Sequence, residues 1–156
     1  MTDNSGRKQP LLLPAEDCAQ LLLPVLISAC LLGVPCRWHG RRAKRRDGLL
    51  ARLKTRYVLV PVCPEQLGGM PTPRTSETLT RGATGADVLD GKVCLIAPET
   101  GEDVTHHHIA GARYTLEIAE IVGARRAYLT SGSPSCDRDG VTGEMLRRAG
   151  IEVMRV

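Results

Sequence analysis

Short apolar runs alternate along most of the chain with stretches that carry apolar residues at helical spacing. The apolar runs typical of strands are 25–29, 57–62, 127–130 and 151–156. The stretches typical of helices are 41–55, 106–122 and 141–149. Strands that alternate with helices favour an α/β fold. We therefore expect a single-domain, Rossmann-like parallel sheet with helices on both faces.

Three of these elements carry more detailed expectations. The run at 57–62 is continuously apolar, which is typical of a strand covered on both faces. Thr105 can cap the helix over 106–122, and Gly123 follows its last residue. Val93–Ala97, followed by a turn and a returning segment, predicts a small β-hairpin insertion.

Two regions lack a regular pattern. Residues 64–91 are rich in proline and glycine, which predicts a long loop, and a loop of this length is more often functional than idle. Residues 1–10 are polar and expected to be disordered, and 11–24 are expected to dock as an appendage. We therefore divide the chain into a partly disordered N-terminal appendage at 1–24 and a folded domain at 25–156.

The composition is that of a soluble globular protein with an aliphatic core. Of the 156 residues, 42% are hydrophobic and 24% are charged, and none is Phe. Aromatic residues make up 3%, which disfavours a base-stacking platform for single-stranded nucleic acid. The formal charge is +4, and a basic run at 37–56 leaves two interpretations open, an anionic or nucleic-acid partner and a solvated surface.

The six cysteines favour metal or catalytic chemistry over disulfides. The leucine-rich N-terminal stretch is interrupted by Pro14, Glu16, Asp17 and Pro24, so we expect neither a signal peptide nor a membrane span. This pattern predicts a cytoplasmic protein with reduced thiols and no membrane partner.

Three cysteines follow predicted strands. Cys30 follows the first strand and Cys63 the second, while Cys136 lies a few residues past the third. The carboxyl ends of parallel strands meet at one edge of the sheet, where ligands bind. Thiolates bind iron–sulfur clusters and zinc, although the chain has no Cys-x-x-Cys pair. From spacing alone, a metal centre and a set of buried structural thiols both remain open.

Polar residues beside these cysteines are further candidates for the site. Glu65 lies two residues after Cys63, where a carboxylate could transfer a proton near a metal or cap a turn. Ser133 and Ser135 could donate hydrogen bonds to sulfur or to a substrate, or satisfy the backbone of a turn.

Two other groups of residues are placed outside the centre. Cys18 lies in the appendage and Cys94 in an apolar run, so we expect a bystander or core role for both. His106, His107 and His108 are consecutive and cannot share one face, so we expect a solvent-exposed cluster at a helix start.

Three segments together resemble the thiouracil desulfidase family. They are Ser28–Arg37 (SACLLGVPCR), Pro61–Arg74 (PVCPEQLGGMPTPR) and Ser133–Cys136 (SPSC). Asp103–Thr105, followed by Gly111 and Ala112, also matches the family pattern. The resemblance runs over about 25–156, and it implies that this part of the chain is a desulfidase-like catalytic domain.

The resemblance implies a 4Fe-4S cluster held by Cys30, Cys63 and Cys136, with one iron open to the sulfur of a small thiolated pyrimidine such as 2-thiouracil. It places the acid–base carboxylate on Glu65 and a site serine on Ser133. Cys36 also matches a motif cysteine; we expect a supporting or gating role for it, with metal ligation as the alternative. The implied reaction is a non-redox removal of sulfur that yields the oxo base and sulfide.

The chain departs from the family pattern at three places. Asp137–Asp139 stands where a longer insert is usual, Trp38–His39 replaces Tyr-Asp, and Ser131–Gly132 replaces a more basic sequence. We expect the shortened loop to change the lid over the pocket. Two other functions remain open. One is a non-catalytic iron–sulfur or zinc protein that acts as a sensor or carrier, and the other is a thiolated-RNA-processing protein that uses the basic run at 37–56.

Overall fold

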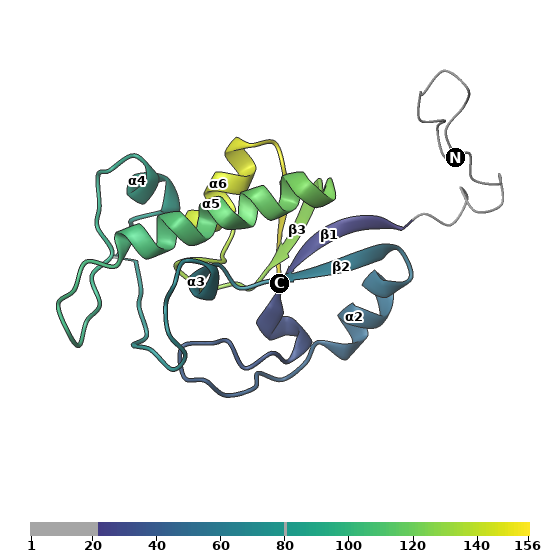
Figure 1. The fold of residues 1–156 in the computed structure, drawn as a ribbon, viewed down its shortest axis with the longest axis horizontal. Helices are drawn as coiled ribbons and strands as arrows, with labels where there is room; N and C mark the ends of the chain where they lie inside the picture. Colours follow the sequence, from purple (N-terminus) through teal and green to yellow (C-terminus); the bar gives the residue numbers. More distant parts are fainter. Residues whose placement is uncertain (1–21, 80) are drawn as a thin grey trace, which may run out of the picture.

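Four parallel strands form one sheet with the spatial order β2-β1-β3-β4 (Figure 1). The computed structural model describes residues 22–79 and 81–156. Its strands are β1 (Leu23–Ser28), β2 (Tyr57–Val62), β3 (Arg126–Leu129) and β4 (Glu152–Arg155). β1 lies between β2 and β3 and pairs in parallel with both. The predicted parallel sheet is therefore confirmed.

Helices cover both faces of the sheet. Successive side chains of β1 point to opposite faces, and each set packs against different helices. Leu26 of β1 belongs to a buried cluster with Ala119 of α5 (Thr105–Val122) and Leu146 of α6 (Val141–Arg148). Ile27 belongs to a second cluster, which includes Leu50 and Leu53 of α2 (Asp47–Lys54). Figure 1 shows α5 and α6 on one side of the strands and α2 on the other. The α/β architecture with helices on both faces is confirmed.

The expectation that the strand at 57–62 is covered on both faces is wrong. β2 lies at the edge of the sheet, and of its six residues Val62 alone is buried. Val58 is 50% exposed. Pro61 is also exposed. Proline has no N–H group to donate to a neighbouring strand, and an edge strand tolerates this because one of its sides has no neighbour.

Two helices differ from the sequence prediction at their starts. α2 begins at Asp47 and not at residue 41, because the preceding residues are mainly arginine and lysine, which are unfavourable at the positive end of a helix. α5 has Val104 as its N-cap, and the Thr105 hydroxyl instead accepts a hydrogen bond from the Leu95 N–H at 2.8 Å. The predicted end of α5 at Gly123 is confirmed by its left-handed backbone, with φ of 71°.

The predicted loop at 64–91 contains two short helices, α3 (Pro64–Leu67) and α4 (Gly85–Leu89). Thr84 and Asp87 form a reciprocal capping box that starts α4, a signal that the density of glycine and proline concealed. The predicted hairpin at 93–104 is reduced to one isolated antiparallel bridge, between Ile96 and Asp103.

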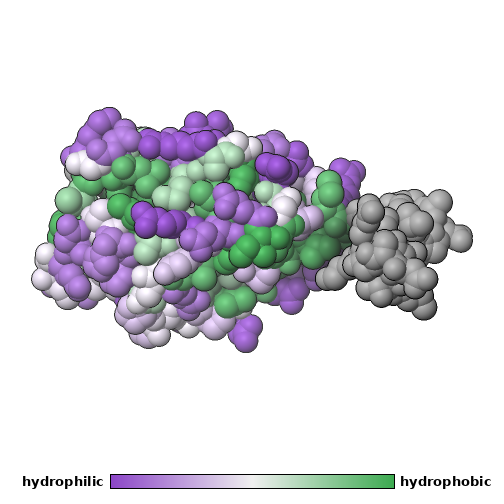
Figure 2. All heavy atoms as spheres, turned by 45° about the horizontal axis from the view of Figure 1, so that its top comes forward, coloured by the Kyte–Doolittle hydropathy of each residue, from purple (hydrophilic) through white to green (hydrophobic). Residues whose placement is uncertain are grey.

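The predicted appendage at 1–24 lies mostly outside the described residues. Leu23 and Pro24 are an exception, because they form the first two positions of β1. Across the described part of the chain, no helix combines the length and apolarity that crossing a bilayer requires. Figure 2 shows apolar and polar side chains intermixed over one face of the molecule.

Candidate metal centre

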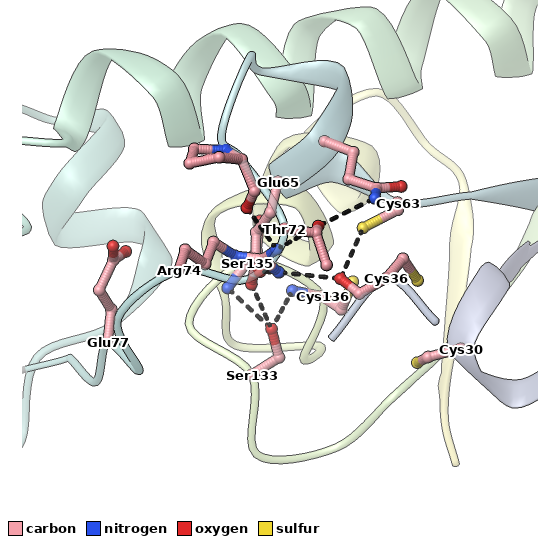
Figure 3. Close-up of polar contacts among 12 residues, drawn as sticks. Cys30, Cys36, Cys63, Glu65, Thr72, Arg74, Glu77, Ser133, Ser135 and Cys136 are labelled. Carbon is pink, nitrogen blue, oxygen red and sulfur yellow. Dashed lines mark hydrogen bonds and ion pairs between the residues drawn. The ribbon is translucent and has the colours of Figure 1, made fainter. Parts of the chain in front are cut away.

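Three cysteines that follow three strands line one cavity at the carboxyl edge of the sheet (Figure 3). Cys30 lies in the 3-10 turn η1 (Ala29–Leu32) after β1, Cys63 separates β2 from α3, and Cys136 lies in the loop after β3. The cavity has a volume of about 150 Å³. Strands β2 and β3 lie on opposite sides of β1, so the cavity sits at the switch point where parallel α/β sheets bind ligands.

A fourth cavity thiol, Cys36, lies next to both Cys30 and Cys63. Its hydrogen bond is the main reason that the pKa of Cys30 falls to about 6 and that of Cys63 to about 7, against the opposing effect of burial. Thr130 Oγ1, 3.1 Å from Cys30 Sγ, and the backbone N–H of Gln66 beside Cys63 act in the same direction. The thiols of Cys30 and Cys63 in turn raise the pKa of Cys36 far above its usual range, which keeps the Cys36 thiol protonated.

Cys136 differs from the other thiols in its burial. Loss of solvent raises its pKa to about 12, although hydrogen bonds from Ser28 and Ser133 partly offset this effect. In the metal-free protein Cys136 is therefore a neutral thiol, and binding a metal there would release its proton.

The donor set has the soft sulfur chemistry that an iron–sulfur cluster requires. Within residues 22–79 and 81–156, no three Cys, His, Asp or Glu side chains are placed to hold one metal ion. Thiolates around a cluster each bind a different iron and need not converge on one point. Four soft sulfur donors line this cavity, and two of them ionise readily.

A carboxylate, Glu65, lies in the wall of the same cavity, in the first turn of α3. Its Oε2 forms an ion pair with Arg74, and its Oε1 accepts a hydrogen bond from Ser133 Oγ at 3.3 Å. The Arg74 guanidinium also donates to the carbonyl oxygen of Cys36 at 3.1 Å. The Glu65 side chain is 15% exposed and that of Arg74 is 5% exposed, so the carboxylate is held in one orientation.

Ser133 organises the loop that carries Cys136. While it donates to Glu65, its Oγ accepts hydrogen bonds from the backbone N–H groups of Ser135 and Cys136, at 3.2 and 3.0 Å. The hydroxyl therefore joins the cysteine loop to the carboxylate (Figure 3).

The short segment Asp137–Asp139 is tied to the last strand. Arg155 of β4 binds Asp137 at 2.6 Å and Asp139 at 2.8 Å, and Asp137 also accepts the Gly132 N–H at 2.6 Å. The loop that is short relative to the family pattern is thus fixed at both of its ends.

Two glycines allow α3 to lie directly against α5. A Cβ at Gly111 of α5 would overlap the carbonyl oxygen of Pro64, and a Cβ at Gly68 would overlap the α5 backbone. This contact fixes Cys63 and Glu65, at the start of α3, against the long helix.

Several site residues were not identified from the sequence. Arg74 is the last residue of the second of the three family segments, but the sequence did not indicate a function for it. Thr130 belongs to none of the three segments. Glu77 and His108 form a buried pair, with Glu77 Oε2 2.6 Å from His108 Nε2. The expectation that all three histidines are solvent-exposed is wrong for His108, which is fully buried because it lies on the face of α5 that also buries Ala112 and Thr115.

Other cysteine and charge predictions have mixed outcomes. Cys94 is an exposed free thiol, because no strand forms there, so of its two predicted roles the core one is excluded and the bystander one stays a prediction. Cys18 lies outside the described residues. The charged side chains of the basic run at 37–56 are exposed, mostly outside α2. Arg37, Lys44 and Arg46 line a second cavity of about 350 Å³. This cavity shares Cys30, Arg37 and Thr130 with the thiol-lined one.

Comparisons with known proteins agree with this geometry. The family model described as 2-thiouracil desulfurase matches residues 25–155. The chain is 34% identical over 145 residues to the uncharacterized protein YbbK of Bacillus subtilis (strain 168), covering 83% of this chain and 93% of YbbK. The solved structure of the 4Fe-4S-dependent thiouracil desulfidase TudS is similar, with a TM-score of 0.68 and 29% identity over 85% of this chain and 90% of that chain. The predicted resemblance is confirmed, and the chain belongs to the 2-thiouracil desulfurase family of enzymes.

Proposed function

We propose that this enzyme removes sulfur from a small thiolated pyrimidine of the 2-thiouracil type, and that it uses a 4Fe-4S cluster to do so. The observation that carries the proposal is the meeting of Cys30, Cys63 and Cys136 with the Glu65–Ser133 pair in one cavity. The family description and the cluster dependence of the TudS relative support it.

We assign Cys30, Cys63 and Cys136 as the cluster ligands, which leaves one iron without a protein ligand. When bound, such a cluster supplies a soft Lewis acid for a thiocarbonyl sulfur. Cys36 follows η1 and not a strand, so we assign it as a supporting neighbour and not as a fourth ligand. Cys136 starts as a neutral thiol, but it is the cysteine carried by the third strand-end loop and positioned by Ser133.

The overall reaction exchanges C=S for C=O without net electron transfer. Water supplies the oxygen, and its two protons leave with the sulfur as hydrogen sulfide. Glu65 accepts a proton from the attacking water at Oε1, because Oε2 is occupied by Arg74. Two backbone N–H groups occupy both acceptor sites of Ser133 Oγ, so that its own proton is directed at Glu65 and orients Oε1. Glu65 then passes the proton that it has accepted to the departing sulfur.

The free thiols require a reducing compartment, so we place the enzyme in the cytoplasm.

The test is anaerobic reconstitution of the full chain with iron and sulfide, followed by incubation with 2-thiouracil. We expect uracil and sulfide to form in equal amounts, measured by chromatography and a colorimetric sulfide assay. The matched control is the same protein before reconstitution, which should form neither product.

Two outcomes would contradict the proposal. Stable cluster binding without any product would favour a non-catalytic iron–sulfur protein. Equal activity before and after reconstitution, with iron removed by a chelator, would show that the cluster is not needed.

A further inference from the structure

One wall of the thiol-lined cavity is an irregular segment, residues 71–79, which we call the strap. It leads from α3 toward α4, and five consecutive residues of it, Arg74–Thr78, line the cavity. Among the described residues, its one backbone–backbone hydrogen bond joins the Arg74 N–H to the Trp38 carbonyl oxygen at 2.8 Å. Side chains must therefore hold most of the strap in place.

Glu77 is the buried residue of the strap. Ser76 and Thr78 on either side of it are exposed, whereas the Glu77 side chain is 5% exposed and its partner His108 is 0% exposed. The two atoms of the contact, Glu77 Oε2 and His108 Nε2, are 2.6 Å apart. Leu79 adds partial packing against the apolar cluster that includes Val88.

Stability alone does not account for this pair. Glu77 Oε1 and His108 Nδ1 are both buried and have no hydrogen-bond partner among the described residues. Buried polar atoms without partners are costly, and apolar side chains of similar volume are often at least as stable in such places. A directional contact, unlike an apolar one, fixes the position of the strap along α5.

The segments that carry Glu65 and Arg74, the two residues of the ion pair, are both attached to α5. Glu65 lies on α3, which packs backbone to backbone on Gly111 of α5. Arg74 lies on the strap, which Glu77 ties to His108, one helical turn before Gly111 on α5. One rigid element thus places both the carboxylate and the guanidinium that binds it.

We propose that Glu77 and His108 are positioning residues, which anchor the strap to α5 and thereby hold Arg74 on Glu65. The expected effect on kcat rests on the proposed function, in which Glu65 accepts a proton. Loss of the anchor should release Arg74 and leave the carboxylate without a fixed orientation. The cysteines are not on the strap, so cluster binding should be unaffected.

The kinetic test compares His108→Leu, which cannot donate a hydrogen bond to Glu77, with His108→Gln, which can. In the reconstituted enzyme we expect His108→Leu to lower kcat for 2-thiouracil roughly tenfold, because a misplaced catalytic group commonly costs one to two orders of magnitude. His108→Gln should retain most of the activity, and iron content should be unchanged in both variants. His106→Leu, on an exposed histidine of the same helical turn, is the matched control.

A double-mutant cycle with Arg74→Ala tests whether the anchor acts through Arg74. In that background His108→Leu should change kcat less than twofold. An equal loss in both backgrounds would overturn the inference, as would full activity of His108→Leu. If that variant does not fold, the paired exchange Glu77→Met/His108→Leu replaces it, and full activity of the pair would be equally contradictory.

A second readout does not depend on activity. Trp38 is the sole tryptophan, it lines the cavity, and its carbonyl oxygen binds the strap. In cluster-free protein, His108→Leu should increase acrylamide quenching of Trp38 fluorescence, and His108→Gln should not. Unchanged quenching in His108→Leu would contradict the anchoring of the strap. Absence of sulfide release by the wild type would refute only the proposed function, so the two failures can be told apart.

Discussion

Ser133 Oγ lies 3.3 Å from Glu65 Oε1, although the two residues are 68 positions apart in the chain. The contact joins the loop after β3 to the helix after β2, across the strand that lies between them. Arg74 occupies the other carboxylate oxygen. The two oxygens of Glu65 therefore have different partners, since Oε2 is bound by a positive charge and Oε1 by a hydroxyl group.

Replacement of Glu65 by Gln should separate cluster binding from catalysis. The amide keeps the shape of the side chain but cannot accept a proton, so we expect sulfide release to fall by about 10²- to 10⁴-fold. The visible absorption and the iron content of the reconstituted protein should match the wild type. Residual turnover within a few fold of the wild type would show that Glu65 is not the proton acceptor.

Single serine variants should separate ligands from neighbours among the four thiols. We expect Cys30→Ser, Cys63→Ser and Cys136→Ser each to lose most of the bound iron after reconstitution. Cys36→Ser should keep it, because Cys36 follows η1 and not a strand and we assign it as a neighbour of the ligands. Iron analysis per protein chain is the measurement, and loss of iron in Cys36→Ser with retention in Cys136→Ser would reverse the assignment.

The thiol pKa values predict a pH dependence for alkylation of the cluster-free protein. Thiolate is the reactive form, so the iodoacetamide reaction of Cys30 should rise with pH through about 6 and that of Cys63 through about 7. Cys136, with its pKa raised to about 12, should react little below about pH 9. Site-resolved mass spectrometry measures all three rates.

A variant of Thr130 tests the cause of the low pKa of Cys30. Thr130→Val removes a hydrogen bond that lowers the pKa of Cys30, so the inflection for Cys30 should move to higher pH while that for Cys63 stays in place. Thr78→Val, at an exposed position of the same cavity, should move neither. A parallel shift of both inflections would point to a general change in the cavity.

Gly111→Ala should disrupt the contact of α3 with α5. The added Cβ would overlap the Pro64 carbonyl oxygen, and overpacking of this kind costs about 1–3 kcal/mol of the free energy of unfolding. Gly48→Ala is the control, since a Cβ there meets no atom within 4 Å and Ala favours a helix by about 1 kcal/mol. Urea unfolding of both variants provides the comparison, and equal stability of the two would contradict the backbone contact.

The placement of the thiols could be predicted because it follows from topology. Cys30, Cys63 and Cys136 each follow a strand, and parallel strands end at a common edge. Their roles as ligands stay a prediction. The edge position of β2 could not be read from its apolar sequence, because strand order depends on which crossover each helix makes.

Contacts between the loops could not be predicted for a different reason. The Arg74–Glu65 and Glu77–His108 pairs depend on the path of the strap, which has almost no regular backbone hydrogen bonding to leave a periodic signal. His108 lies on the buried face of α5, with Ala112 and Thr115, and the sequence prediction missed this because it treated the three histidines as one exposed group. Side-chain pairs that join irregular segments carry no pattern in a single sequence.

The last two residues of the chain are part of the architecture around the thiols. Arg155 binds both aspartates of the loop that follows Cys136, and Val156 exchanges backbone hydrogen bonds with Leu129 and Ser131 at the start of that loop. Removal of Arg155 and Val156 would therefore act directly on the loop that carries Cys136. Recombinant versions intended for cluster loading should leave these two residues unaltered.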